Sequence, residues 1–208
     1  MEHGIIVGTS GGKYDNNNPL ARYLISRFDR AICELAAHVS PGNVLEIGAG
    51  EGHVTNLLLE STGARIVATD ISETVLAQAE RNLGSGRVTY RAVDLMAMAP
   101  LRPRPEMVVC CEVLEHLSDP RQGLTALLAQ AADWYLLSVP REPVWRVLNM
   151  ARGAYWRDLG NSPGHLQHWS QQQFLRLVGQ YFQPIAVRSP LPWTVVLCRP
   201  KRGRNTAL

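Results

Sequence analysis

The sequence predicts an α/β fold built on a mostly parallel sheet, and three observations indicate this class. Short β-like runs alternate with helical stretches through the middle of the chain, the pattern of parallel strands joined by helical crossovers. The runs at 44–47 and 107–111 are apolar with little alternation, which is typical of central strands covered on both faces. The 208 residues, 46% of them hydrophobic, suffice for one core and are too few for two ordinary domains. We therefore expect residues 1–208 to form a single domain.

The first expected element is a helix that begins at Pro19 and ends near residue 39. Asn18 is a favourable N-cap, proline fits the first helical position, and apolar residues follow at helical spacing. The later strands are expected at 43–47, 65–69, 88–92, 107–111 and 134–139, with helices between them near 53–61, 73–82 and 119–131. A short helix at 143–152, a helix at about 170–181 and two runs at 184–188 and 193–198, close enough for a hairpin, complete the expected elements.

Three segments lie outside this pattern. Residues 1–18 are rich in Gly, Asn and Ser, so we expect a flexible arm. Residues 140–169 are too long for a simple connection, and such insertions form lids or pockets. Aromatic and arginine side chains in this insertion favour a planar or anionic substrate: Trp145, Tyr155, Trp156, Trp169, Arg141, Arg146, Arg152 and Arg157. The alternative is an amphipathic helix that packs these aromatics on the core and leaves the arginines in solvent.

The formal net charge of +3 originates at the C-terminal end of the chain. Residues 1–158 carry 15 basic and 18 acidic side chains, whereas residues 159–208 carry six basic and none acidic. A basic tail at 199–208 is usually solvated, so the charge is weak support for a nucleic-acid partner. The distribution of charge therefore disfavours a nucleic-acid partner.

The four cysteines and the hydropathy pattern indicate the cytoplasm. Cys33, Cys110, Cys111 and Cys198 have neither zinc-ligand spacing nor the look of a disulfide framework. The apolar run near the N-terminus is far shorter than the core of a signal peptide, and no stretch is long enough for a membrane span. We expect a cytoplasmic protein that does not associate with membranes, either a monomer or a homodimer.

The most informative stretch is VLEIGAGEGHVT at 44–55, where Gly48, Gly50 and Gly52 separate a strand from a helix. Glycines at such a junction let the backbone turn sharply and approach a ligand closely. A phosphate-binding P-loop needs a Lys-Ser/Thr pair that is absent here. The dinucleotide pattern G-x-G-x-x-G would need a glycine at His53, which disfavours an NAD-dependent oxidoreductase.

Acidic residues follow three successive expected strands. Glu46 precedes the glycines, Asp70 ends the second strand, and Asp94 follows the third. An acid at the tip of the second strand can accept hydrogen bonds from both ribose hydroxyls. Asp94 can accept from an adenine amine, with Ile71 or Leu95 against the ring. Each acid alone can equally be a helix cap or a surface residue, but together they outline an adenosine-shaped crevice.

At these residues the sequence resembles the class I S-adenosylmethionine-dependent methyltransferases, over about residues 40–140. It has the E-x-G-x-G-x-G loop and both later acids, but lacks the family's Pro-Gly-Gly turn before strand five, where QAADWY stands. The resemblance implies a Rossmann-like sheet of seven strands, the last antiparallel, with helices on both faces. It also implies that S-adenosylmethionine binds and leaves as S-adenosylhomocysteine. The residues expected to hold this cofactor are Glu46, Gly48, Ala49, Gly50, Gly52, Asp70, Ile71, Asp94, Leu95 and Cys111.

The segment after the fourth strand, CCEVLEHL, is similar to methyltransferases of the ubiquinone-biosynthesis type, which show E-x-x-E-H. Glu112, Glu115 and His116 share one face if this turn is helical. Some relatives, including enzymes that methylate the 3′ ends of small RNAs, bind a divalent cation with this motif and a later histidine, for which His165 is a candidate. Carboxylates with imidazoles suit such a metal, but many relatives with the motif use none. The presence of a metal therefore remains open.

We predict transfer of a methyl group to a small-molecule acceptor, with oxygen favoured as the acceptor atom. A hydroxyl nucleophile must lose its proton, and histidine suits that task. The candidates for this chemistry are His116, His165, His168 and Glu112. Two alternatives are kept: a metal-dependent RNA 3′-terminal 2′-O-methyltransferase, and a cofactor-binding interaction module without catalysis.

Overall fold

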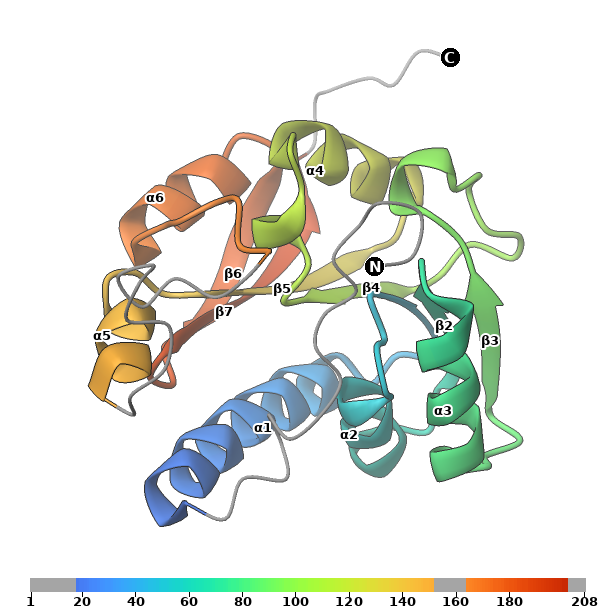
Figure 1. Cartoon of the computed structure of the whole chain (residues 1–208). Helices are drawn as coiled ribbons and strands as arrows, with labels where there is room; N and C mark the ends of the chain where they lie inside the picture. Colours follow the sequence, from blue (N-terminus) through green and yellow to red (C-terminus); the bar gives the residue numbers. More distant parts are fainter. Residues whose placement is uncertain (1–17, 152–163, 202–208) are drawn as a thin grey trace.

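A seven-stranded sheet forms the centre of the molecule in a computed structural model that describes residues 18–151 and 164–201 (Figure 1). The strands are β1 (Asn43–Ile47), β2 (Arg65–Asp70), β3 (Val88–Ala92), β4 (Met107–Cys111), β5 (Trp134–Pro140), β6 (Phe182–Arg188) and β7 (Trp193–Pro200). Their order is β3-β2-β1-β4-β5-β7-β6. The first five strands pair in parallel, and β7 runs antiparallel to both β5 and β6. The predicted fold class, including the antiparallel last strand, is confirmed.

The order of the strands reverses between β1 and β4. From β1 the chain moves outward through β2 to β3, and it then returns to the other side of β1 to form β4 and β5. The carboxyl ends of parallel strands lie at one edge of a sheet, and ligands bind where the order reverses. The register places Ile47 beside Thr69 on one side and Cys110 on the other, so the loops that follow these strands are neighbours.

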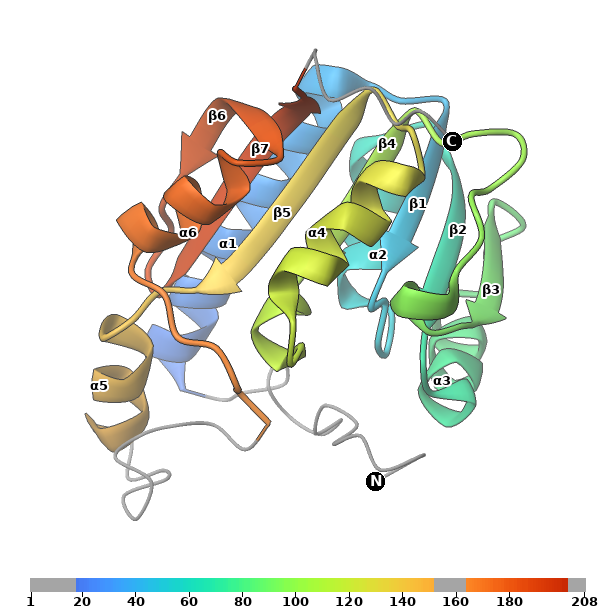
Figure 2. The ribbon, with the colours of Figure 1, turned by 90° about the horizontal axis from the view of Figure 1, so that it is seen from above.

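Helices cover both faces of this sheet (Figure 2). One face carries α1 (Pro19–Val39), α2 (His53–Ser61) and α3 (Glu73–Leu83), and the other carries α4 (Pro120–Ala129) and α6 (Gln171–Val178). Two short 3₁₀ helices, η1 (Leu95–Ala97) and η2 (Leu114–His116), follow β3 and β4, and α5 (Val144–Ala151) follows β5. Side-chain caps fix several helix starts, among them the Ser170 capping box of α6.

Two hydrophobic cores lie on opposite faces of the central strands. Val109 of β4 faces the core under α1 and α2, whereas its neighbours Val108 and Cys110 face the core under α4 and α6. All five residues of β4 are buried, because helices pack on both sides. The apolar runs without alternation are therefore explained, as predicted, by central strands that are covered on both faces.

Most element bounds agree with the prediction to within two residues. The helix predicted at 170–181 ends at Val178, because Gly179 caps it and the chain then enters β6 at Phe182. Parts of three predicted segments lie outside the described residues: 1–17 of the arm, 152–163 of the insertion and 202–208 of the tail. No helix within the described part of the chain has the length and apolarity that a membrane crossing needs.

Candidate functional site

The turn between β1 and α2, residues 48–52, is called the glycine loop here. Gly48, Gly50 and Gly52 have φ values of +73°, +55° and +90°, in a region that residues with a side chain rarely adopt. A Cβ atom at Gly48 would lie 2.2 Å from Val113 Cγ2, and one at Gly52 would lie 2.8 Å from Leu83 Cδ1. A Cβ atom at Gly50 would meet nothing within 4 Å. Packing therefore requires the outer two glycines, while Gly50 borders open space that a ligand can occupy.

Glu46 places a buried carboxyl group at the end of β1, with 1% of its surface exposed. Oε2 accepts a 2.7 Å hydrogen bond from the Thr55 hydroxyl, and Oε1 has no hydrogen-bond partner among the described residues. Burial raises the pKa of Glu46 to about 7, although the Thr55 hydrogen bond opposes this shift. A buried acceptor oxygen with unused capacity favours a ligand that carries a hydrogen-bond donor or a positive charge.

Asp70 connects the end of β2 to the glycine loop. Oδ2 accepts a hydrogen bond from the Gly50 N–H at 2.9 Å, and Oδ1 accepts from the Ser72 N–H at 3.0 Å. Sequence reasoning assigned Asp70 to a ligand and did not anticipate that it also orients the loop. Asp94 caps η1 by accepting from the Met96 N–H at 2.9 Å, so the capping alternative left open by the sequence is realised there.

The remaining predicted cofactor residues lie along the same edge of the sheet. Ala49 is buried in the glycine loop, Leu95 is buried in η1, and Cys111 is buried at the end of β4. Ile71 is half-buried after β2. Since β3, β2, β1 and β4 are neighbours in this order, the structure brings these predicted residues to adjacent loops.

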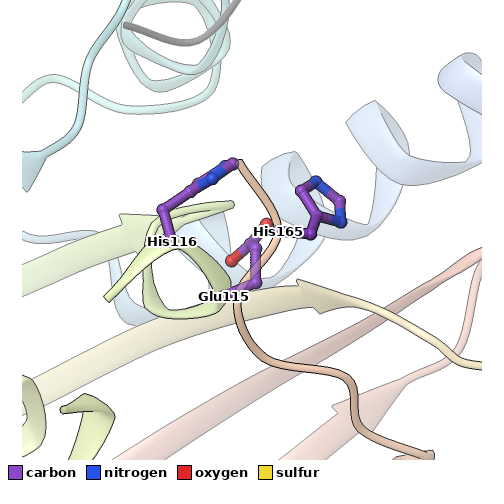
Figure 3. A group of neighbouring side chains, drawn as sticks. All are labelled: Glu115, His116 and His165. Atoms are coloured by element: carbon purple, nitrogen blue, oxygen red, sulfur yellow. The ribbon is translucent and has the colours of Figure 1, made fainter. Parts of the chain in front are cut away.

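Glu115, His116 and His165 form a second group, which we call the histidine cluster (Figure 3). One ligand atom from each residue lies within 4.8 Å of the others, and the three side chains lie next to one another. Glu115 is 1% exposed, whereas both histidines are half-buried. The imidazole rings of His116 and His165 meet edge to face, with centroids 5.0 Å apart. The cluster joins residues that are 49 positions apart in the chain.

Backbone hydrogen bonds hold the two parts of this cluster together. The carbonyl oxygen of Glu115 accepts from the N–H groups of Leu166 and Gln167 at 2.9 and 3.0 Å. His116 Nδ1 lies 2.9 Å from the carbonyl oxygen of Gly164, which can only accept, so Nδ1 donates. The neutral imidazole of His116 therefore has its basic lone pair on Nε2.

Glu112 does not join the histidine cluster. The turn is not helical at this position, because η2 begins at Leu114 and Glu112 has a φ of +59°. The condition for Glu112 to share a face with Glu115 and His116 is therefore not met. Its carboxylate instead accepts from Trp193 Nε1 at 2.8 Å and from Ser138 Oγ at 3.3 Å.

His168 also lies apart from this cluster. It lies near Glu142: burial raises the pKa of the Glu142 carboxyl group, and the Arg146 backbone N–H and His168 oppose this shift only in part. The Glu142 carboxylate also accepts from the Arg146 N–H at 3.4 Å. The structure thus brings two of the predicted histidines, His116 and His165, together and places His168 beside an acidic side chain.

A row of aromatic rings leads from α1 to the histidine cluster. Phe28 contacts Trp193 with centroids 4.9 Å apart, and Trp193 contacts Trp145 at 5.7 Å. Trp145 then stacks on His165 at 5.8 Å with an interplanar angle of 28°. Sequence reasoning missed Trp193, because nothing in the local pattern relates it to Glu112, 81 residues earlier. Of the aromatic and arginine residues in the insertion, Arg152, Tyr155, Trp156 and Arg157 lie outside the described residues.

Comparison with known proteins gives concordant results. A family model described as a methyltransferase domain matches residues 20–181. The chain is 31% identical over 113 residues to a ubiquinone biosynthesis O-methyltransferase of Nitrosospira multiformis, covering 51% of this chain and 47% of the relative. It is 29% identical over 159 residues to a trans-aconitate 2-methyltransferase of Variovorax paradoxus, covering 71% and 61%. The chain thus spans about half the length of the first of these relatives.

The fold also matches a solved structure over nearly the whole chain. Magnesium protoporphyrin IX methyltransferase from Synechocystis PCC 6803, solved with bound SAH, superposes with a TM-score of 0.66 at 15% identity. The match covers 94% of this chain and 91% of that structure. At this identity the likeness shows that the fold is shared.

Proposed function

Because the chain belongs to the methyltransferase domain family and is a class I S-adenosylmethionine-dependent methyltransferase, we propose that it methylates a hydroxyl oxygen of a small-molecule acceptor. The observation that carries this proposal is the histidine cluster beside the end of β4. It brings ligand atoms of two imidazoles and a carboxyl group within 4.8 Å of one another. The cluster follows β4, and the adjacent strand β1 leads into the glycine loop.

The residues at the edge of the sheet fit the cofactor. Glu46 has a buried oxygen with unused acceptor capacity, and the backbone at Gly50 borders open space. We propose that these two residues, with Asp70 and Asp94, hold S-adenosylmethionine. When bound, this cofactor supplies an electrophilic methyl group on a sulfonium centre.

The histidine cluster supplies a proton acceptor. Nε2 of His116 is its basic nitrogen, because Nδ1 donates to the Gly164 carbonyl oxygen. An imidazole in this state can take the proton of a hydroxyl group as the oxygen attacks. Glu115 is buried beside this imidazole and places a carboxyl group next to it. These residues therefore suit an acceptor that needs deprotonation.

The surroundings of the histidine cluster, where we propose that the acceptor binds, also favour a planar molecule with an acidic or phenolic hydroxyl group. The half-buried ring of Trp145 stacks on His165, and aromatic rings beside an acceptor site favour planar groups. The similar proteins named above are an O-methyltransferase of ubiquinone biosynthesis and a methyltransferase for trans-aconitate. Both names are compatible with a small acceptor molecule.

The proposal is tested by incubating the purified chain with S-adenosylmethionine carrying a labelled methyl group and a panel of catechols, phenols, carboxylic acids and amines. We expect label on at least one hydroxylated acceptor, and its loss by a factor of about 100 or more in His116→Ala. His38→Ala, an exposed histidine at the end of α1, is the matched control and should retain transfer. Transfer only to amines, or undiminished transfer in His116→Ala, would contradict the proposal.

A second candidate function uses the same three side chains as metal ligands. Glu115, His116 and His165 offer one carboxylate oxygen and two ring nitrogens, a donor set that suits a divalent cation. The Nδ1 hydrogen bond of His116 to a backbone carbonyl resembles the support that metal-binding histidines receive. A cation there would bind neighbouring hydroxyl groups and lower the pKa of one of them. This observation favours the RNA 3′-terminal 2′-O-methyltransferase alternative.

The two candidates differ in their metal dependence. Activity that survives exhaustive chelation supports histidine as the proton acceptor. Activity lost with chelator and restored by Mn²⁺, Mg²⁺ or Zn²⁺, together with methylation of an RNA 3′ end, supports the metal-dependent alternative.

A further inference from the structure

We infer that Trp193 is a positioning residue that holds the segment 112–116 in place between the glycine loop and the histidine cluster, an inference that rests on the proposed function. Trp193 begins β7 and is 3% exposed. Its indole N–H donates a 2.8 Å hydrogen bond to Glu112 Oε2. A hydrogen bond from a buried donor to a carboxylate is among the stronger side-chain interactions in proteins.

The backbone of Glu112 needs such support. Its φ of +59° lies in the left-handed region, which residues with a side chain adopt only where the surroundings impose it. Three contacts fix this residue to β5 and β7. They are the indole hydrogen bond, the Ser138 hydroxyl 3.3 Å from Glu112 Oε1, and the Glu112 N–H donated to the Ser138 carbonyl at 3.1 Å. The left-handed turn after β4 is therefore held by the adjacent strand β5 and by β7 beyond it.

The same turn determines two contacts on opposite sides. The next residue, Val113, packs directly on Gly48, where even one added carbon would lie 2.2 Å from its side chain. Glu115 and His116 follow within the same short segment and provide two members of the histidine cluster. A displacement of Glu112 thus shifts a cofactor-side contact and the acceptor-side cluster together.

The ring of Trp193 adds a second connection to the cluster. It packs between Phe28 of α1 and Trp145 of α5, and Trp145 stacks on His165. Phenylalanine at position 193 can keep an aromatic ring among these neighbours while it removes the N–H donor. This substitution separates the hydrogen bond from the packing.

The inference is tested by a double-mutant cycle in the full chain, with S-adenosylhomocysteine affinity measured by titration calorimetry. We expect Trp193→Phe and Glu112→Ala each to weaken binding by about tenfold, the scale of one charged hydrogen bond. The double variant should be weaker than either single one by no more than about threefold, because both changes remove the same interaction. Glu112→Gln keeps an acceptor oxygen and should restore most of the affinity. Trp134→Phe, at the other end of β5 beside Arg199, should bind like the unmodified chain.

A spectroscopic readout separates positioning from simple packing. The ¹⁵N–¹H resonance of the Trp193 indole should move in Glu112→Ala and remain near its original position in Glu112→Gln. The inference would be overturned if the losses of affinity in the two single variants multiplied in the double variant. It would also be overturned if the indole resonance did not move in Glu112→Ala. The inference is also overturned if Trp193→Phe lowers the melting temperature yet leaves the affinity unchanged. Neither measurement requires methyl transfer, so this inference and the proposed function can fail separately.

Discussion

The backbone N–H of Gly50 donates a 2.9 Å hydrogen bond to Oδ2 of Asp70, so the turn after β1 and the end of β2 are joined at the edge of the sheet. The acid predicted to bind a ligand therefore also orients the loop that is predicted to approach it. We therefore expect a substitution at Asp70 to act on the proposed cofactor site both directly and through the glycine loop.

We predict that Asp70→Ala weakens S-adenosylhomocysteine binding by more than tenfold. The substitution removes an acceptor for the proposed ribose hydroxyls and also releases the Gly50 N–H. Calorimetric titration measures the effect, and Glu80→Ala, an exposed acid on α3, is the control. Equal affinities for the Asp70 variant and the unmodified chain would show that this carboxylate has no part in the site.

The glycines of the loop should differ in their tolerance of a methyl group. Gly48→Ala combines a left-handed φ with a 2.2 Å approach to Val113, and we expect a loss of about 3 kcal/mol in the free energy of unfolding. Gly50→Ala retains only the conformational strain, about 1 kcal/mol, but its Cβ points into the space proposed for the ligand.

Denaturant unfolding and calorimetry together check this difference. Gly50→Ala should lose affinity for S-adenosylhomocysteine while it stays folded. Gly63→Ala is the matched control, because its Cβ would meet nothing within 4 Å and no left-handed φ is involved. If Gly50→Ala bound the ligand normally, the space beside Gly50 would not be the cofactor site.

Glu46 should make the stability of the unliganded protein depend on pH. Burial raises its pKa from 4.5 to about 7, so the folded state retains a proton that the unfolded state releases above pH 4.5. The contribution is present below pH 4.5 and is lost as pH rises toward 7, by about 3 kcal/mol in total.

Glu46→Gln removes this titration and keeps an acceptor for Thr55. We expect the variant to gain stability relative to the unmodified chain as pH increases from 5 to 8, measured by denaturant unfolding at each pH. Parallel pH profiles for the two proteins would contradict the raised pKa.

The two histidines that follow residue 163 should behave differently. His165 belongs to the histidine cluster, whereas His168 lies beside Glu142. We predict that His165→Ala lowers methyl transfer by at least about tenfold at unchanged S-adenosylhomocysteine affinity. His168→Ala should retain most of the transfer rate. The reverse ranking in single-turnover assays would show that His168, and not His165, takes part in methyl transfer.

Local sequence patterns predicted nearly all elements of the fold for identifiable reasons. Pro19 after Asn18 marks the start of α1, because a cap and a fixed φ both act on neighbouring residues. The apolar run of β4 predicted a central strand, because helices on both faces leave no polar side. The E-x-G-x-G-x-G loop was likewise visible, since its left-handed backbone requires glycine.

The composition of the acceptor side was predicted only in part. The spacing of Glu112, Glu115 and His116 is a local fact, but which of them meet depends on a left-handed residue that no local rule indicates. The pairing of η2 with residues 164–167 depends on backbone hydrogen bonds across about 50 residues. The end of α6 differs from the prediction for another reason: Gly179 caps the helix after Val178, a local signal that the predicted span to residue 181 passed over.

The sequence by itself determined the alternation of elements, the glycine loop and the acids at the ends of successive strands, because each depends on neighbouring residues or on a fixed period. Only the tertiary structure decided that Asp70 orients Gly50, that Trp193 holds Glu112, and that Glu115, His116 and His165 gather in one cluster. Each of these relationships joins residues from different strands or loops. The pairings of β1 with β2 and of β5 with β7, and the return of the chain over η2, bring such residues together, and none of them leaves a periodic signal in the sequence.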